Sequence, residues 1–204
     1  MNVLVFGSPQ LARWEARPFY DMTRHAGDRD DVYERDVGRE PWRGAPGPLH
    51  RALGDAILGY DIFPPRLVRG VLRQRIAVGD TIGIHYIAAR IVRLFFAARV
   101  VAVLDGPSAD GAWWGTGFTY RTLQGHPELG EETFAVETEL ATGRVRVALR
   151  SWSRPGTWLA RTFAPVVRWM QVHASEAALA HLARRAATAP RAGETVPAAS
   201  LSSA

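Results

Sequence analysis

The chain has 204 residues, 47% of them hydrophobic and 22% charged, a balance typical of one globular domain. It contains no cysteine, which excludes disulfides, thiolate metal sites and cysteine nucleophiles. It also contains no lysine, which excludes Schiff-base chemistry and the lysine of a phosphate-binding loop. We therefore expect neither a cofactor nor a metal.

The net charge of +5 comes from arginines that are scattered among acidic residues, without a dense basic stripe. This pattern argues against a nucleic-acid partner. The first residues lack a charged leader and a long apolar run, and the apolar stretch 82–104 is interrupted by His85, Arg90, Arg93 and Arg99. We expect a cytoplasmic protein without integral membrane association, and the sequence leaves its oligomeric state open.

Residues 1–48 are rich in Arg, Asp, Gly and Pro, and we expect them to add a short strand near 32–37 and loops to the main domain. Apolar residues from Leu49 follow helical spacing, and Pro64-Pro65 ends that helix by Phe63. The β-branched segments 66–76, 81–87 and 99–104 predict strands, whereas 88–98 fits a helix or a strand equally.

Three further strands are predicted at 113–123, 131–140 and 144–153, and their short connections favour antiparallel pairing. Strand alternation places two sets of side chains in the core: Phe134, Val136, Thr138 and Leu140, and then Val145, Val147 and Leu149.

A long helix follows, with an apolar stripe from Leu159 to Leu182 and a bend or break at Pro165. The core domain is expected to span 49–187, and the small, polar segment 188–204 to be a disordered tail.

The segment from Gly117 to Phe134, GFTYRTLQGHPELGEETF, resembles the signature of a bacterial and plant family of unknown function. RVVAVLD at 99–105 and RSWSRP at 150–155 support the likeness, which covers roughly residues 55–185. Arg121 stands where the family usually has Gly, and Gln124 where it has Pro.

The family in turn resembles, distantly, the START and polyketide-cyclase-like proteins of the SRPBCC group. This likeness implies an α+β fold of the helix-grip type, in which a curved antiparallel sheet wraps around a long C-terminal helix. It also implies an apolar cavity between sheet and helix, but no particular reaction.

The turn after the first half of this segment carries the best chemical cluster, His126 with Glu131 and Glu132. One interpretation makes His126 a general acid or base oriented by a carboxylate. The other, which we favour, is that His126 and Glu131 stabilise a tight turn.

Strand alternation directs Glu132 towards the core and Glu131 away from it. An inward carboxylate needs a partner, and we expect Tyr120, Thr122 or an arginine. Tyr120, His126 and Glu132 are the candidate catalytic residues, and these three with Thr122, Arg150 and Trp152 are the candidate ligand-binding residues. Arg150, Trp152 and Arg154 share one strand face, which suits either an anionic or aromatic ligand or an ordinary outer surface.

Three functions remain open. The first is binding of a small hydrophobic molecule, lipid-like or polyketide-like, in the cavity. The second is an enzyme of the cyclase, dehydratase or isomerase type that uses the same cavity. The third is a scaffold or partner-binding protein.

Overall fold

One curved sheet forms the body of the protein. The computed structural model describes residues 3–4, 9–41, 43–88 and 92–189. In this part of the chain, eight strands lie in the order β1-β3-β4-β5-β6-β7-β8-β2. All neighbours pair antiparallel except β1, which pairs parallel with β3. The strands are β1 (Val3–Leu4), β2 (Arg29–Arg39), β3 (Val68–Leu72), β4 (Thr81–Ala88), β5 (Val92–Pro107), β6 (Trp113–Thr122), β7 (Glu128–Glu139) and β8 (Arg144–Pro155).

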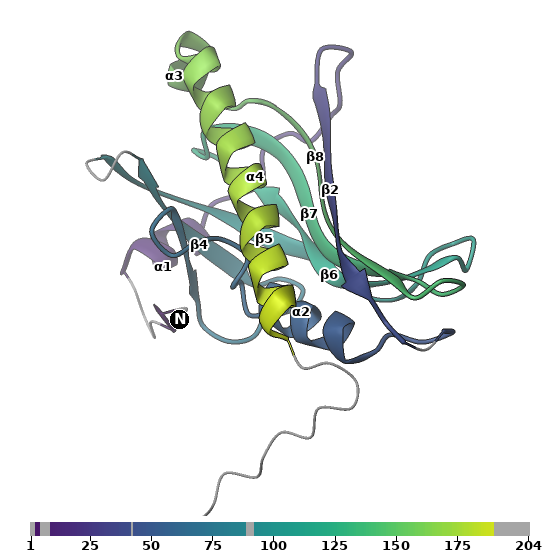
Figure 1. Ribbon diagram of the computed structural model, residues 1–204. Coiled ribbons are helices and arrows are strands. Elements are labelled where there is room, and N and C mark those ends of the chain that lie inside the picture. Colours follow the sequence, from purple (N-terminus) through teal and green to yellow (C-terminus); the bar gives the residue numbers. More distant parts are fainter. Residues whose placement is uncertain (1–2, 5–8, 42, 89–91, 190–204) are drawn as a thin grey trace, which may run out of the picture.

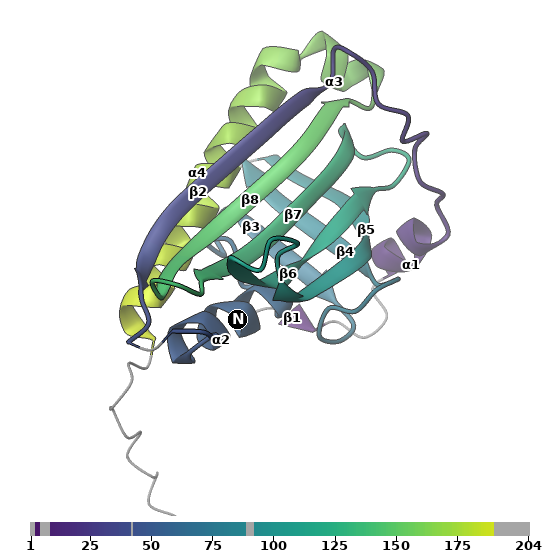
Figure 2. The ribbon, with the colours of Figure 1, turned by 90° about the vertical axis from the view of Figure 1, so that its right-hand side faces the viewer.

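The sheet curves around the C-terminal helix, α4 (Ala164–Thr188), as Figures 1 and 2 show. Register shifts between Val100 and Ala102 in β5 and between Asp36 and Gly38 in β2 mark bulges, which increase the bending of a strand. The expected helix-grip architecture is therefore confirmed.

Two shorter helices close other parts of the sheet. Helix α2 (Pro48–Leu58) packs against β6, β7 and α4, with Leu53 and Ile57 buried. Helix α1 (Pro9–Glu15) lies on the outer side, where Trp14 packs against Ala97 and Leu123. None of the helices in the described part of the chain is both long and apolar enough to cross a membrane.

The core between sheet, α2 and α4 is centred on aromatic rings. Phe118 and Phe134 are fully buried with centroids 5.4 Å apart, and Tyr60, Phe63 and Tyr120 surround them. The predicted inward residues of 145–149 are all buried, as are Phe134, Val136 and Thr138, so the alternation is confirmed for these positions. The prediction is wrong for Leu140, which follows the end of β7 at Glu139 and is only partly buried. Among the described residues of this main core there is no tryptophan.

The predicted apolar stripe of the last helix is only partly covered. Pro165 interrupts the helix, as expected: α3 (Trp158–Thr162) ends before it, and Pro165 lies in the first turn of α4. The first residues of the stripe, Leu159, Phe163 and Val166, are more than half exposed. Ala178 and Leu182, farther along α4, are buried.

The N-terminal segment contributes more than the sequence indicated. Its predicted short strand is the 11-residue β2, which pairs along β8 at one edge of the sheet. The division into residues 1–48 and 49–187 stays a prediction. Helix α4 reaches Thr188, and the rest of the predicted tail, from residue 190, lies outside the described residues.

Candidate functional site

A cavity of about 180 Å³ lies between the sheet and α4. Strands β3 to β8 and the loop after α2 supply one wall, and α4 supplies the other. Most of the lining is apolar, for example Phe63, Ile84, Phe96, Val167 and Met170. Polar side chains lie between them, but the accessible wall is mainly apolar, which is the composition of a small-molecule site.

Glu132 and Tyr120 form the central polar pair of this cavity. They face each other across β6 and β7, and the Tyr120 hydroxyl donates a 2.6 Å hydrogen bond to Oε2 of Glu132. The prediction of an inward Glu132 with Tyr120 as a partner is confirmed. Burial raises the pKa of Glu132 to about 7, even though the Tyr120 hydrogen bond lowers it. Burial likewise raises the pKa of Tyr120.

Glu131 lies on the opposite face of β7. Its carboxylate accepts a 2.6 Å hydrogen bond from Nε of Arg121, the directly opposed residue on β6. The predicted alternation of the two glutamates is therefore confirmed, and Glu131 does not orient His126.

His126 is buried at the turn between β6 and β7 and lines the cavity. Gly125 precedes it with a φ of +95°, which favours glycine. The Nδ1 of His126 lies 2.8 Å from the carbonyl oxygen of Glu128 and 3.1 Å from its backbone nitrogen, so the ring stabilises the turn. Nε2 is buried without a hydrogen-bond partner among the described residues. Burial lowers the pKa of His126 to about 4.

Thr122 and Glu128 also contribute to the polar part of the cavity lining. The Thr122 hydroxyl accepts from the backbone N–H of Gly130 at 2.9 Å, so it stabilises the β6–β7 pairing. The Glu128 carboxylate is mostly buried, and its nearest cation is Arg29, at 3.5 Å. Burial is the largest influence on the pKa of Glu128 and raises it.

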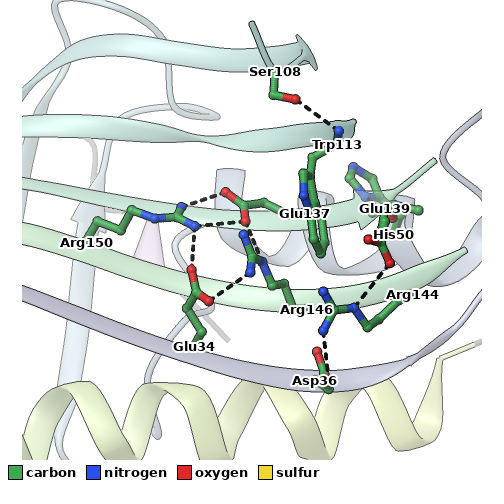
Figure 3. A network of polar contacts seen from close by, with 11 residues as sticks. Glu34, Asp36, His50, Ser108, Trp113, Glu137, Glu139, Arg144, Arg146 and Arg150 are labelled. Atoms are coloured by element: carbon green, nitrogen blue, oxygen red, sulfur yellow. Dashed lines mark hydrogen bonds and ion pairs between the residues drawn. The ribbon is translucent and has the colours of Figure 1, made fainter. Parts of the chain in front are cut away.

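Arg150 lies on the outer face of the sheet, away from the cavity lining. Its guanidinium pairs with Glu137 at 2.6 Å and Glu34 at 2.7 Å, and Arg146 bridges the same two carboxylates (Figure 3). Trp152 belongs to the residues around the cavity, but the guanidinium of Arg24 lies over its ring, 5.1 Å from the centroid. The structure thus brings together Tyr120, Thr122, His126 and Glu132 but separates Arg150 from them.

A second buried polar group, at the other end of the sheet, was not indicated by the sequence. His50 on α2 is 1% exposed and lies between Thr138 and Thr116, with ring nitrogens 2.8 and 2.9 Å from their hydroxyls. Burial lowers its pKa to about 4. Because Thr116 and Thr138 are 66 and 88 positions from His50 in the chain, only the packing of α2 on β6 and β7, which the sequence did not indicate, brings the cluster together.

Within the described residues, no group of three or more His, Asp or Glu side chains is placed to hold a metal ion.

Residues 19–181 match a family model described as a domain of unknown function, DUF1990. The chain belongs to the DUF1990 family. The matched range contains every cavity residue named above, together with the segment 117–134 on which the resemblance was based. Membership assigns no reaction to the DUF1990 chain.

The chain is also similar to a UPF0548 protein from Dictyostelium discoideum, at 36% identity over 102 residues. The match covers 47% of this chain and 46% of the relative, so the chain spans about half the length of that curated protein.

Among solved structures, the chain resembles an uncharacterised protein from Rhizobium leguminosarum (TM-score 0.48, 13% identity, 79% of this chain and 95% of that one). It also resembles norcoclaurine synthase from Thalictrum, with a TM-score of 0.47 and 7% identity over 79% of this chain and 98% of that one. A third similar structure is the di-domain aromatase/cyclase StfQ of steffimycin biosynthesis, with a TM-score of 0.47 and 13% identity over 79% of this chain and 51% of that one. These likenesses are loose, and the fold assignment rests on the strand order and the helix themselves.

Proposed function

We propose that the protein binds a small hydrophobic ligand in the cavity between the sheet and α4. The observation that carries the proposal is a mainly apolar, partly enclosed space in which a few buried polar groups converge, above all the Tyr120–Glu132 pair. Such a combination provides affinity through apolar contact and orientation through hydrogen bonds.

The cavity's size narrows the ligand. Its volume of about 180 Å³ is close to that of an engineered apolar cavity of ~150 Å³ that holds benzene, and below the ~300 Å³ at which drug-sized sites begin. A compact, single-ring or short-chain molecule therefore fits as the structure stands. A longer lipid-like or polyketide-like molecule would extend through the mouth.

Ligand binding is tested by thermal unfolding and calorimetry with compact apolar probes. A ligand at 100 times its Kd raises the free energy of unfolding by about 2.7 kcal/mol and shifts the Tm upward. Ala174→Leu, on the cavity wall, is expected to abolish the shift by filling the space. Ala180→Leu, on α4 outside the lining, is the matched control and should retain it. A folded protein that binds none of the probes would disprove the proposal.

Glu132 favours a second candidate function, proton transfer to or from a bound ligand. A carboxyl group with a pKa of about 7 inside an apolar cavity is suited to general acid or base catalysis near neutral pH. The discriminating measurement is mass spectrometry of each bound ligand after incubation. Conversion that is lost in Glu132→Gln while binding persists supports an enzyme, and unchanged ligand supports a binding protein.

A further inference from the structure

The ionisable groups of the cavity are acidic or neutral. Among the described lining residues there is no arginine, whereas Glu128 and Glu132 contribute carboxyl groups. Glu131 also belongs to the lining, but its carboxylate is turned to the other face of β7, where it pairs with Arg121. Arg154 pairs with Asp28, and Arg29, which is outside the lining, lies 3.5 Å from the Glu128 carboxylate. A ligand carboxylate would therefore be placed beside like charges, without a lining cation to compensate for its lost hydration.

Three of the hydrogen-bond donors that line the cavity are already occupied. The Tyr120 hydroxyl donates to Glu132, the Ser175 hydroxyl to the carbonyl oxygen of Gln171, and the Gln171 amide to Ser153. Because each hydroxyl has a single hydrogen, Tyr120 and Ser175 have none left for a ligand in this arrangement.

Acceptors, by contrast, remain available. Of the two contacts that Nδ1 of His126 makes, the contact to the carbonyl oxygen of Glu128 is the shorter. Because a carbonyl oxygen can only accept a hydrogen bond, we assign the hydrogen of the neutral His126 ring to Nδ1. Nε2 of His126 is then an unpartnered acceptor in a side chain that is 7% exposed. In Glu132, Tyr120 occupies only Oε2.

From the lining carboxylates and the unpartnered Nε2 of His126 we infer that the cavity selects a compact apolar ligand carrying a hydrogen-bond donor, a hydroxyl or an amine, and rejects ligands headed by a carboxylate. The inference rests on the proposed function, because it specifies the chemistry of the ligand in the same cavity. Donor groups satisfy the buried His126 and the partly buried Glu132, which otherwise keep unused acceptor capacity.

Three probes of similar shape test the inference: 4-ethylphenol, 4-ethyltoluene and the 4-ethylbenzoate anion. Calorimetry at pH 8, above the Glu132 pKa of about 7, should give 4-ethylphenol a Kd about tenfold lower than that of 4-ethyltoluene, as one hydrogen bond to a charged acceptor allows. The benzoate should bind most weakly.

Probe binding by two variants tests whether Glu132 causes the selectivity. Glu132→Gln removes the negative charge and adds an N–H donor, so the benzoate should gain at least about tenfold in affinity. Glu131→Gln is the matched control, because the neighbouring carboxylate pairs with Arg121 on the opposite face, and it should retain the wild-type order.

The outcomes separate the two proposals. Equal binding of all three probes, or tightest binding of the benzoate, overturns the selectivity while leaving ligand binding intact. Binding of none of them by the folded protein overturns both. An order that Glu132→Gln leaves unchanged also contradicts the inference, because the selectivity would then arise elsewhere.

Discussion

Glu132 and the two buried histidines couple the protein's stability to pH in opposite directions. Glu132 has a pKa of about 7 in the folded protein and an ordinary value near 4.5 when unfolded, so its stabilising contribution is full below 4.5 and is lost as the pH rises through 7. His50 and His126, with pKa values of about 4, behave differently. They titrate near 6.5 when unfolded, so they cost stability as the pH falls from 6.5 to 4.

Glu132→Gln should therefore become progressively more stable, relative to the wild type, as the pH rises from 4.5 to 8. One pKa unit corresponds to 1.36 kcal/mol, so the difference in free energy of unfolding should change by up to about 3 kcal/mol over this range. Urea unfolding of both proteins at several pH values measures it. The histidine contributions cancel in this comparison. A difference that does not vary with pH would show that the Glu132 pKa is ordinary.

Residue-level prediction from the sequence was accurate where strand alternation applied. Alternation separated Glu131 from Glu132, and the cost of an inward carboxylate predicted a partner among Tyr120, Thr122 and the arginines. The structure selects Tyr120, the residue directly opposite Glu132 on β6. Alternation also grouped Arg150 with Trp152, but could not show that Glu34 and Glu137 would pair with Arg150. His50 was missed because its partners are contributed by packing between distant elements.

At the level of elements, the break between α3 and α4 has a local cause. Proline lacks a backbone N–H, and the first turn of a helix is where that group has no intrahelical partner. Pro165 occupies this position in α4, and Thr157 caps α3 by accepting from the N–H of Ala160. The sequence showed that the helix would be interrupted, but not that its first apolar residues would be exposed.

Pro165→Ala should change the free energy of unfolding by less than about 1 kcal/mol, because this proline disrupts no helical hydrogen bond. Glu176→Pro, at an exposed site inside α4, is the contrasting variant and should cost about 3 kcal/mol or more. Denaturant unfolding monitored by far-ultraviolet circular dichroism compares the two. A large loss in Pro165→Ala would mean that Pro165 is required for the α3–α4 junction.

The sequence of segment 88–98 fitted a helix or a strand equally, and its described part forms strand; residues 89–91 lie outside the described residues. From Val92 onward it belongs to β5, and Phe95 and Phe96 pair with His85 and Ile84 of β4. Local apolar runs do not distinguish the two structures, whereas pairing with β4 and β6 on either side does. Long-range pairing thus supplied what local propensity could not.

At the scale of the whole molecule, the two faces of the sheet differ in chemistry. The concave face carries the apolar core and the cavity, whereas the outer face of β2, β7 and β8 carries alternating charges, including Glu34, Glu137, Arg146 and Arg150 (Figure 3). Arg146 and Arg150 each pair with both Glu34 and Glu137, so their positive charges are neutralised on this face.

Arg150→Ala should accordingly reduce stability without changing ligand affinity. Removal of one cation from a partly exposed network costs about 1 kcal/mol at low ionic strength, and less in about 1 M salt, where the pairs are screened. Parallel unfolding and probe-binding measurements separate the two effects. A tenfold loss of affinity at unchanged stability would instead place Arg150 in the ligand site, as the sequence allowed.

The tyrosine- and phenylalanine-based core has a spectroscopic consequence. The described tryptophans lie outside the main core, with Trp158 and Trp169 more than half exposed, whereas Tyr60 and Tyr120 are buried beside the cavity. Among the described tryptophans only Trp152 lies around the cavity, so most of their emission will report on sites outside it. Events inside the cavity will be recorded in the near-ultraviolet absorption and dichroism of the buried tyrosines, which makes those bands the natural optical signal for the occupied protein.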